Sequence, residues 1–341
     1  MTEDHRMPPE TRQLLAWYAV NGRDLPWRVR GGPHPDPYAV WVSEIMLQQT
    51  TVKTVLDYFP RWMERFPTLK SLAESPLDDV LKTWQGLGYY ARARKMHECA
   101  RHVMDHCGGV FPRQREKLLK LPGIGPYTAS SLCAFAFDLP ETVVDGNVIR
   151  VLARLRGLTG EADRNVIYPL AAELTPRTCG ADYASAVMDL GATVCKASSP
   201  LCGECPWRES CVARREGIQN RIPVLKRPEK KKKCGAVFIL ENARGELFIR
   251  RRPGRGLLAG LWELPWSDDG TFPFSADWRR MPLSVRHVFT HFDLTLAFYR
   301  CDPPFPGDLT GTGVFVTERD QEKYAFSTLM KKVLKELGRA G

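Results

Sequence analysis

Four cysteines carry the most specific chemistry in the sequence. They are Cys195, Cys202, Cys205 and Cys211, and their spacing is C-x6-C-x2-C-x5-C. Four thiolates in so short a stretch suit either Zn²⁺ or a [4Fe–4S] cluster. Zinc sites usually pair two short C-x2–4-C turns across a longer gap, whereas here one short turn is flanked by two longer loops. The spacing therefore favours the larger iron–sulfur cluster.

Two carboxylates stand out by their surroundings. Glu44 lies in the otherwise apolar stretch WVSEIML, and Gln48 and Thr51 follow four and seven residues later, on the same predicted helix face. A carboxyl group in apolar surroundings has a raised pKa, as a general acid requires. Asp145 follows an apolar run and precedes a predicted helix, where it fits an N-cap. An ordinary helix-face glutamate and a structural cap also explain these two residues.

The segment LPGIGPYTAS, residues 121–130, predicts a helix-hairpin-helix. Gly123 and Gly125 allow the backbone of the turn to come close to a partner. The free N–H groups that open the following helix, together with its dipole, can bind a phosphate. The same pattern also fits a glycine-rich helical hairpin without a ligand.

The elements that must position these residues are mainly helical up to about residue 210. Residues 41–66 carry apolar side chains at helical spacing. Further helices are predicted at residues 11–20, 77–84, 91–106, 115–120, 126–137, 147–156, 166–174 and 182–191.

The composition changes after the last clustered cysteine. Residues 212–233 hold nine Lys or Arg and two Glu, which is a net charge of +7. They predict a basic linker, which is either a solvated tether or a tether that also contacts phosphates. Residues 234–252 predict a strand, a turn at 242–245 and a second strand; 284–301 is strand-like and 326–338 an amphipathic helix. We therefore predict one domain at 8–211 and another at 234–341, joined by this linker.

The whole-chain composition excludes several classes of protein. The 341 residues are 43% hydrophobic, which excludes a wholly disordered or fibrous protein. No run approaches the ~20 apolar residues that span a bilayer, and the N-terminus lacks an apolar signal region. We expect a cytoplasmic monomer, associated with the nucleoid if bacterial, without a membrane partner. The charge of +10 favours nucleic acid as the partner, although a merely basic soluble protein has the same charge.

Together these segments resemble the adenine DNA glycosylases of the MutY type, in the endonuclease III superfamily of helix-hairpin-helix glycosylases. The resemblance rests on the cysteine loop and on LPWR (25–28), DPYAVWVSEIMLQQT (36–50), GLGYYARAR (86–94), LPGIGPYTA (121–129), VDGNVIRVLAR (144–154) and MDLGATVC (188–195). It implies a mainly α N-terminal helix-hairpin-helix glycosylase domain with an iron–sulfur cluster loop, and a small α+β Nudix-like C-terminal domain. It also implies an enzyme that removes adenine paired with 8-oxoguanine or guanine from double-stranded DNA in base excision repair.

The resemblance implies a role for individual residues. Glu44 would protonate the adenine, and Asp145 would stabilise the oxocarbenium-like sugar, either by its charge or as a transient covalent partner. Tyr127 and Asn147 would support these two carboxylates. Superfamily members that cleave the DNA backbone carry a lysine where this chain has Tyr127, and a phenol cannot form their Schiff base. A monofunctional glycosylase is therefore expected.

The same resemblance implies contacts with the DNA once the target base is flipped out. Gln48 and Tyr89 would insert at the lesion, while Gly123 and Gly125 would hold the DNA backbone. The residues that would surround the adenine are Leu25, Trp27, Arg28 and Asp189. Asp189 occupies a position where some relatives have glutamate. The loop RGGPHP, residues 30–35, is longer than the family pattern.

The C-terminal domain resembles a Nudix hydrolase without its catalytic signature. GLLAGLWELP (256–265) matches the start of that fold, but no R-E-x-x-E-E run for Mg²⁺ follows. Phe289, Thr290 and His291 match an F-S-H loop of the family's 8-oxoguanine reader, and a plain strand segment is the alternative. We therefore predict a lesion-recognition domain rather than a hydrolase.

Two other functions compete with this interpretation. One is a bifunctional glycosylase and lyase, against which Tyr127 and the extra C-terminal domain argue. The other is a non-catalytic, zinc-stabilised DNA-binding protein, against which Glu44 and Asp145 argue.

Overall fold

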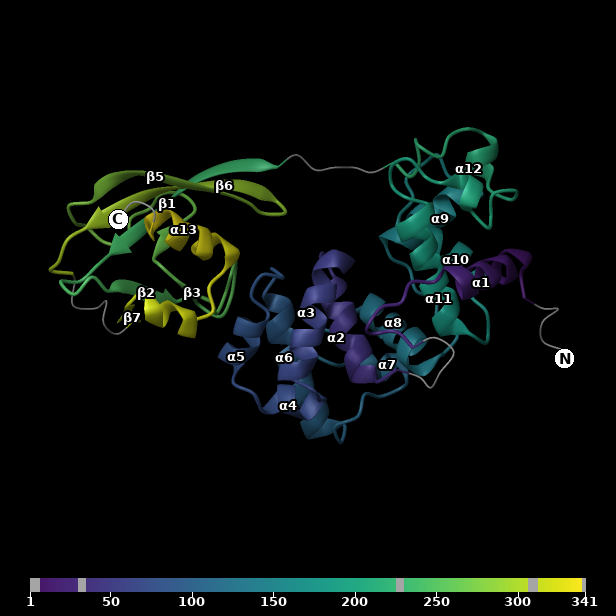
Figure 1. Ribbon diagram of the computed structural model, residues 1–341, viewed down its shortest axis with the longest axis horizontal. Coiled ribbons are helices and arrows are strands. Elements are labelled where there is room, and N and C mark those ends of the chain that lie inside the picture. Colours follow the sequence, from purple (N-terminus) through teal and green to yellow (C-terminus); the bar gives the residue numbers. More distant parts are fainter. Residues whose placement is uncertain (1–6, 30–34, 225–229, 306–311, 339–341) are drawn as a thin grey trace. The chain divides into compact units, whose positions relative to one another are not determined.

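A computed structural model describes residues 7–29, 35–224, 230–305 and 312–338 (Figure 1). Most of the predicted RGGPHP loop and residues 225–229 of the predicted linker therefore lie outside the described residues. The chain forms two compact units, and each is considered by itself. The first contains residues 1–73 and 98–226, and the second contains residues 74–97 and 227–341.

The first unit is helical, as predicted. Its helices are α1 (Pro9–Asn21), α2 (Pro37–Leu47), α3 (Val52–Arg65), α4 (Leu69–Glu74), α7 (Arg115–Leu118), α8 (Pro126–Phe137), α9 (Gly146–Arg156), α10 (Arg164–Leu174), α11 (Gly180–Asp189) and α12 (Val212–Arg215). A π-helical turn, Leu190–Val194, extends α11, and a 3₁₀ turn, Cys202–Glu204, lies in the cysteine loop. Helix α6 (Ala91–His106) crosses the boundary between the units at residue 97. No helix among the described residues is long and apolar enough to cross a membrane.

Local sequence signals explain where the helices near the site begin and end. Asp145 caps α9, because its Oδ1 accepts a hydrogen bond of 2.8 Å from the backbone N–H of Val148. Gly157 ends α9 at φ +66°, and a Cβ there would lie 2.4 Å from Val212. Pro126 opens α8 directly after the glycine turn, in the position where proline is already helical. The predicted cap at Asp145 is confirmed.

The predicted continuous helix through residues 41–66 is wrong at one point. Helix α2 ends at Leu47 and α3 starts at Val52, with Gln49 between them at φ +58°. Thr51 caps α3 through a 3.3 Å bond from the N–H of Thr54 to its hydroxyl. Gln48 and Thr51 therefore do not continue the helix face of Glu44. The apolar residues keep a helical spacing through this segment, so their pattern does not indicate the break at which Thr51 caps α3.

The core of the first unit brings its N-terminal helix α1 together with segments from its C-terminal half. Apolar residues of α1, α9, α10 and α11 pack in one buried cluster that also contains Trp207 of the cysteine loop. The indole N–H of Trp207 donates to the carbonyl of Glu10 at 2.7 Å. Helix α2 packs against α8, and nearly every residue from Tyr38 to Met46 is buried. Glu44 is thus carried by an element with almost no access to water.

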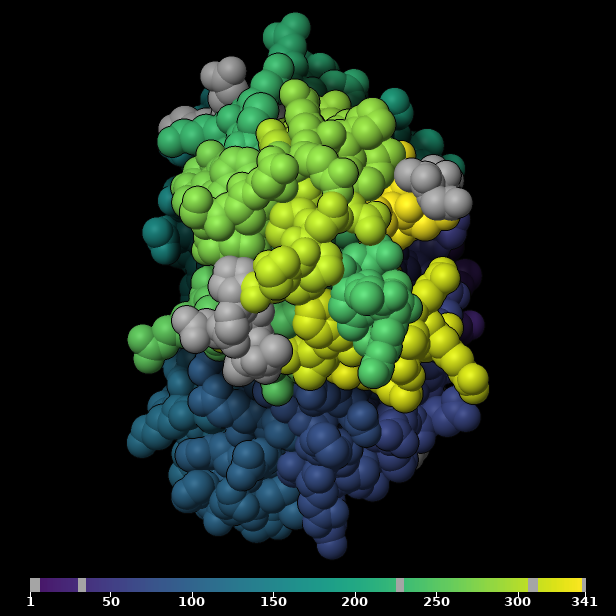
Figure 2. All heavy atoms as spheres, turned by 90° about the vertical axis from the view of Figure 1, so that its left-hand side faces the viewer, coloured from purple at the N-terminus to yellow at the C-terminus, as the bar shows by residue number. Residues whose placement is uncertain are grey.

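The second unit is built from two sheets with a C-terminal helix. One sheet has the order β4-β1-β6-β5 and the other β3-β2-β7. The strands are β1 (Lys231–Leu240), β2 (Leu247–Arg251), β3 (Trp262–Glu263), β4 (Trp266–Ser267), β5 (Arg279–Val288), β6 (Phe292–Cys301) and β7 (Gly313–Val316). In Figure 2 the strands of this unit and its C-terminal helix are coloured from green to yellow. The α+β class predicted for the C-terminal part is confirmed.

The sequence predicted strands of this unit but not their pairing. The strand, turn and second strand predicted at 234–252 are confirmed as β1, its turn and β2; these two strands belong to different sheets, and β1 runs parallel to β6. The strand-like stretch 284–301 is two antiparallel strands that turn at residues 289–291. Helix α13 (Thr328–Gly338) packs its apolar face into the core of the larger sheet. Helix α5 (Leu77–Thr83) also belongs to this unit.

Candidate active site and cysteine loop

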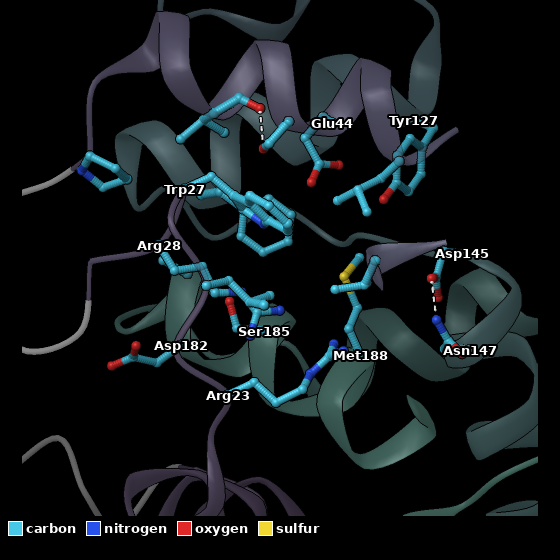
Figure 3. A pocket seen from close by; sticks show the side chains of 18 of the residues that line it. Arg23, Trp27, Arg28, Glu44, Tyr127, Asp145, Asn147, Asp182, Ser185 and Met188 are labelled. Atoms are coloured by element: carbon cyan, nitrogen blue, oxygen red, sulfur yellow. Dashed lines mark hydrogen bonds between the residues drawn. The ribbon is translucent and has the colours of Figure 1, made fainter. Parts of the chain in front are cut away.

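A cavity of about 580 Å³ lies within the first unit (Figure 3). Its walls come from the segment before α2, from α2 and α8, from the start of α9 and from α11. It collects eight residues that the sequence singled out: Leu25, Trp27, Arg28, Glu44, Gln48, Tyr127, Asp145 and Asn147. Residues from positions 25 to 147 thus meet at one place, although they lie on separate elements.

Glu44 reaches into this cavity from the buried helix α2 (Figure 3). Its residue exposure is 6%, and no hydrogen bond from a described residue reaches its Oε2 atom. Burial raises the pKa of Glu44 to about 7, although the hydroxyls of Tyr127 and Ser131 and the charge of Arg28 act in the opposite direction. A carboxyl group with this pKa can hold a proton at neutral pH and release it to a bound molecule.

Tyr127 lines the same cavity from the first turn of α8. Burial raises the pKa of its phenol well above the usual value, and the nearby charges of Glu44 and Asp145 add to the effect. The phenol is therefore neutral at physiological pH and can donate a hydrogen bond. It contains no amine that could form a Schiff base.

Asp145 stands at the start of α9 with both carboxylate oxygens occupied. Oδ1 accepts from the N–H of Val148 at 2.8 Å, and Oδ2 accepts from Nδ2 of Asn147, also at 2.8 Å (Figure 3). The cap and the amide fix the direction of the carboxylate. Asp145 thus presents a fixed negative group to the cavity that Glu44 also lines.

Arg150 ties this carboxylate to the cysteine loop. Its Nη2 donates to Oδ1 of Asn147 at 2.8 Å and to the carbonyl of Gly191 at 2.7 Å, and its Nε donates to the carbonyl of Cys195 at 2.8 Å. Gly191 is required at its position, because a Cβ there would lie 2.7 Å from the Cβ of Asn147. A hydrogen-bonded chain therefore runs from Asp145 to the first cysteine of the loop.

Asp189 does not line the cavity. It is fully buried, and it accepts ion pairs of 2.7 Å from Arg23 and 2.9 Å from Arg28, both of which do line it. The carboxylate therefore orients two arginines toward the cavity. Sequence reasoning missed Arg23, and the only signal was its position two residues before the LPWR motif.

The hairpin glycines adopt the geometry that the motif predicts. Gly123 has φ +75°, which glycine tolerates far better than other residues. Gly125 precedes α8, and a Cβ added there would meet no atom within 4 Å. The turn therefore presents an open face at the start of α8.

The predicted lesion-contacting residues are divided between the two units. Within the second unit, the hydroxyl of Tyr89 forms a hydrogen bond with that of Thr290 in the β5–β6 turn. Tyr89 has φ +46° and is 45% exposed. The ring of Phe289 in the same turn lies 4.7 Å from the ring of Phe292 at the start of β6, and His291 is exposed. Gln48 belongs to the first unit, where its amide donates to the hydroxyl of Thr128 at 3.3 Å.

The four clustered cysteines line one small cavity of their own. Among the described residues, no three His, Cys, Asp or Glu side chains converge closely enough to hold a single metal ion. Four thiols that line one cavity supply the ligand number of a [4Fe–4S] cluster.

The chemistry of the loop also fits such a cluster. Burial raises the pKa of Cys205 to about 12, and a bound metal centre would hold the same thiol as a thiolate. The guanidinium of Arg154 lines the cavity and donates to Sγ of Cys195 at 3.4 Å. Cys195, Cys202, Cys205 and Cys211 would hold the cluster, which orders the loop when bound.

Three family models match successive parts of the chain. Residues 42–177 match the HhH-GPD superfamily of base excision DNA repair proteins. Residues 195–211, which run from the first clustered cysteine to the last, match the iron–sulfur binding domain of endonuclease III. Residues 236–336 match the NUDIX domain.

Individual relatives and solved structures agree with these models. The adenine DNA glycosylase of Rattus norvegicus is 36% identical over 95% of this chain and 77% of the rat protein. The adenine DNA glycosylase of Homo sapiens is 34% identical over 94% of this chain and 72% of its own length. A thermostable thymine-DNA glycosylase structure has a TM-score of 0.55 and 28% identity, over 60% of this chain and 95% of that one.

A further solved structure supports the fold. A non-covalent endonuclease III–DNA complex superposes with a TM-score of 0.52 at 24% identity, over 61% of this chain and 95% of the other. Three observations point to the same family: the helix-hairpin-helix before Tyr127, the loop of four cysteines, and the sequence identity across most of the length of two mammalian relatives. The chain belongs to the adenine DNA glycosylases, enzymes of base excision repair that carry a [4Fe–4S] cluster.

Proposed function

We propose that this enzyme removes adenine that is paired with 8-oxoguanine or guanine in double-stranded DNA, after flipping the adenine into the cavity beside Glu44. The observation that carries the proposal is the placement of a buried, proton-holding Glu44 and a fixed Asp145 on one cavity. This is the pair of groups that breaking a glycosidic bond requires, since one carboxyl must give a proton and the other must remain negative.

The reaction follows from the positions of these two groups. The carboxyl of Glu44 gives its proton to a ring nitrogen of adenine, and the bond between the base and C1′ breaks. The electron pair of that bond leaves with the base, which departs neutral, and the sugar becomes positively charged. Asp145 stabilises this positive charge, either by its field or by a transient bond to C1′. Water then adds to C1′ and loses a proton, which leaves an abasic site.

Neighbouring residues support the two carboxylates. Tyr127 is neutral because of its raised pKa; it stands near both of them, keeps its proton and can donate a hydrogen bond. Asn147 holds Asp145 through its amide. Because Tyr127 offers no amine, the proposed enzyme stops at base removal and does not cleave the DNA strand.

Recognition of the opposite base is assigned to Gln48, Tyr89 and the turn formed by Phe289, Thr290 and His291. The hydrogen bond between the Tyr89 and Thr290 hydroxyls supports a joint role for this turn and Tyr89. The open face at Gly125, after the left-handed Gly123, supports contact of the hairpin with the DNA backbone. Leu25, Trp27 and Arg28 line the cavity and are assigned to the adenine.

A single-turnover assay on A:8-oxoG, A:G and A:C duplexes tests the proposal. Glu44→Gln keeps the shape of the side chain but removes its proton, so adenine release is expected to fall by ~10²-fold or more while duplex binding persists. Glu141→Gln is the matched control, because Glu141 pairs with Arg115 at 3.2 Å and does not line the cavity.

Each rival function predicts a different outcome. A near-normal rate in Glu44→Gln would remove the assigned acid. Strand cleavage by the unmodified enzyme without added base would indicate a lyase. Absence of base release from all three duplexes would indicate a non-catalytic DNA-binding protein. Equal rates on A:8-oxoG and A:G would indicate an adenine glycosylase that does not distinguish 8-oxoguanine from guanine in the opposite strand.

A further inference from the structure

Within the described part of the chain, Arg154 is a buried cation without a carboxylate partner. It lies on α9 and is 2% exposed. Its guanidinium donates to Sγ of Cys195 at 3.4 Å and to loop carbonyls, at 2.6 Å for Lys196, 3.2 Å for Ala197 and 3.0 Å for Ile222. No ion pair joins it to a carboxylate among the described residues. A buried charge of this kind is costly unless an opposite charge lies beside it.

The cysteine cavity provides that opposite charge when the cluster is bound. A [4Fe–4S] core with four thiolate ligands carries a net negative charge, and it becomes more negative when it takes up an electron. The guanidinium lines this cavity and already donates to one of the four sulfurs. Positive charge and N–H donors beside such a cluster stabilise its reduced form more than its oxidised form, because the reduced form has more negative charge.

Gln219 is a second polar group in the same cavity. Its Oε1 atom is buried and has no hydrogen-bond partner among the described residues. A lone acceptor would face the negative sulfurs of a bound cluster and would be repelled by them. A half-turn of the same amide places its NH₂ group toward the cavity and lets it donate to a sulfur.

Two other arginines beside the cluster are in a different situation. Arg208 and Arg214 also line the cavity, but their side chains are 55% and 42% exposed and both lie near Glu209, at 3.1 and 3.7 Å. Water and the paired carboxylate screen their charge. They contain the same functional group as Arg154 without its burial, which makes them useful controls.

We propose that Arg154 and Gln219 form a buried donor set for the iron–sulfur cluster, in which Arg154 is the counter-charge that raises the reduction potential of the cluster. Arg154 also holds the loop through its carbonyls, whereas no hydrogen bond between described residues ties Gln219 to the loop. Substitution of Gln219 therefore separates the electrostatic effect from the folding of the loop.

The test measures the one-electron reduction potential of the cluster-loaded, full-length protein at an electrode. Arg154→Gln removes the charge, and the potential is expected to fall by at least about 59 mV, which is a tenfold change in the equilibrium for one electron. Arg154→Lys keeps the charge without the N–H fork, so its potential should lie between those of Arg154→Gln and the unmodified protein. Gln219→Leu should lower the potential by a smaller amount, and the exposed control Arg208→Gln should leave it nearly unchanged.

A second measurement follows the loss of visible cluster absorbance in the presence of an iron chelator. Arg154→Gln and Gln219→Leu should lose the cluster several-fold faster than Arg208→Gln. If Arg154→Gln does not load a cluster, Arg154→Lys and Gln219→Leu decide the question. Unchanged potentials in these two loaded variants, or an equal shift in Arg208→Gln, would overturn the proposal.

Discussion

Glu44 is the residue whose surroundings predict a pH dependence. Burial raises its pKa to about 7, and only the protonated form can donate to adenine. The single-turnover rate of adenine release is therefore expected to be highest below pH 7 and to fall about tenfold per pH unit well above it. Rates measured between pH 5 and 9 with saturating enzyme check this, and a flat profile across pH 7 would contradict it.

The same burial predicts a cost in stability. Glu44 in an unfolded chain ionises near its ordinary pKa of 4.5, while the folded protein retains the proton up to about pH 7. Because the unfolded chain binds fewer protons between these values, stability falls as the pH rises through this window. Glu44→Gln should raise the free energy of unfolding by up to about 3 kcal/mol at pH 8 and have little effect near pH 4. Denaturant unfolding at both pH values measures the difference.

Single residues also show where sequence reasoning succeeds and fails. The apolar run around Glu44 and the position of Asp145 before a helix are local patterns. The first predicted the burial of Glu44, and the second predicted that Asp145 caps a helix. The pairing of Arg23 with Asp189 spans 166 residues, so no local pattern indicates it. The sequence pattern allowed Asp189 to be assigned to the site. Only the fold shows that Asp189 acts through two arginines rather than by lining the cavity itself.

At the scale of elements, Arg150 joins the start of α9, the π-helical turn and the cysteine loop through three acceptors. Arg150→Lys keeps the positive charge but cannot reach all three. Asp145 should then be held less firmly, and the chemical step is expected to slow by roughly tenfold or more, while iron content and duplex affinity change little. A rate equal to that of the unmodified enzyme would show that Val148 and Asn147 fix Asp145 without help from Arg150.

The cysteine loop has few apolar side chains and depends on its cluster for order. Cys202→Ala should give low iron content, poor solubility and weaker duplex binding, because the neighbouring basic residues contact phosphates only from an ordered surface. In any folded fraction, the chemical step should fall much less than in Glu44→Gln. Normal duplex affinity with a lost chemical step would show instead that the cluster acts in catalysis.

The proposed function assigns catalysis and lesion preference to different parts of the sequence. A chain ending at residue 225 keeps the entire cavity of the first unit but loses Thr290, the partner of Tyr89. It should still release adenine but lose much of its preference for A:8-oxoG over A:G. Parallel single-turnover rates on both duplexes measure this, and Thr290→Val in the full chain is the milder comparison. An unchanged preference in both would place lesion recognition elsewhere.

The division of the chain was only partly visible in its sequence. The change from helical to strand-like pattern marks the second unit well, and the predicted fold class is confirmed. The inclusion of residues 74–97 in that unit was not visible, because it depends on distant contacts such as those of Gln85 and Tyr90 with the carbonyl of Phe326. Strand pairing was also missed, since the parallel pairing of β1 with β6 joins segments about 60 residues apart.

The bond from Trp207 to Glu10 has a consequence for biosynthesis. It joins residues 197 positions apart, so α1 leaves the ribosome long before its partners in the core exist. At ~5–20 residues per second, the delay is about 10–40 s. During that interval the apolar side of α1, with Leu14 and Tyr18, has no α10, α11 or Trp207 to cover it. The nascent chain is therefore most dependent on chaperones until the cysteine loop has been translated.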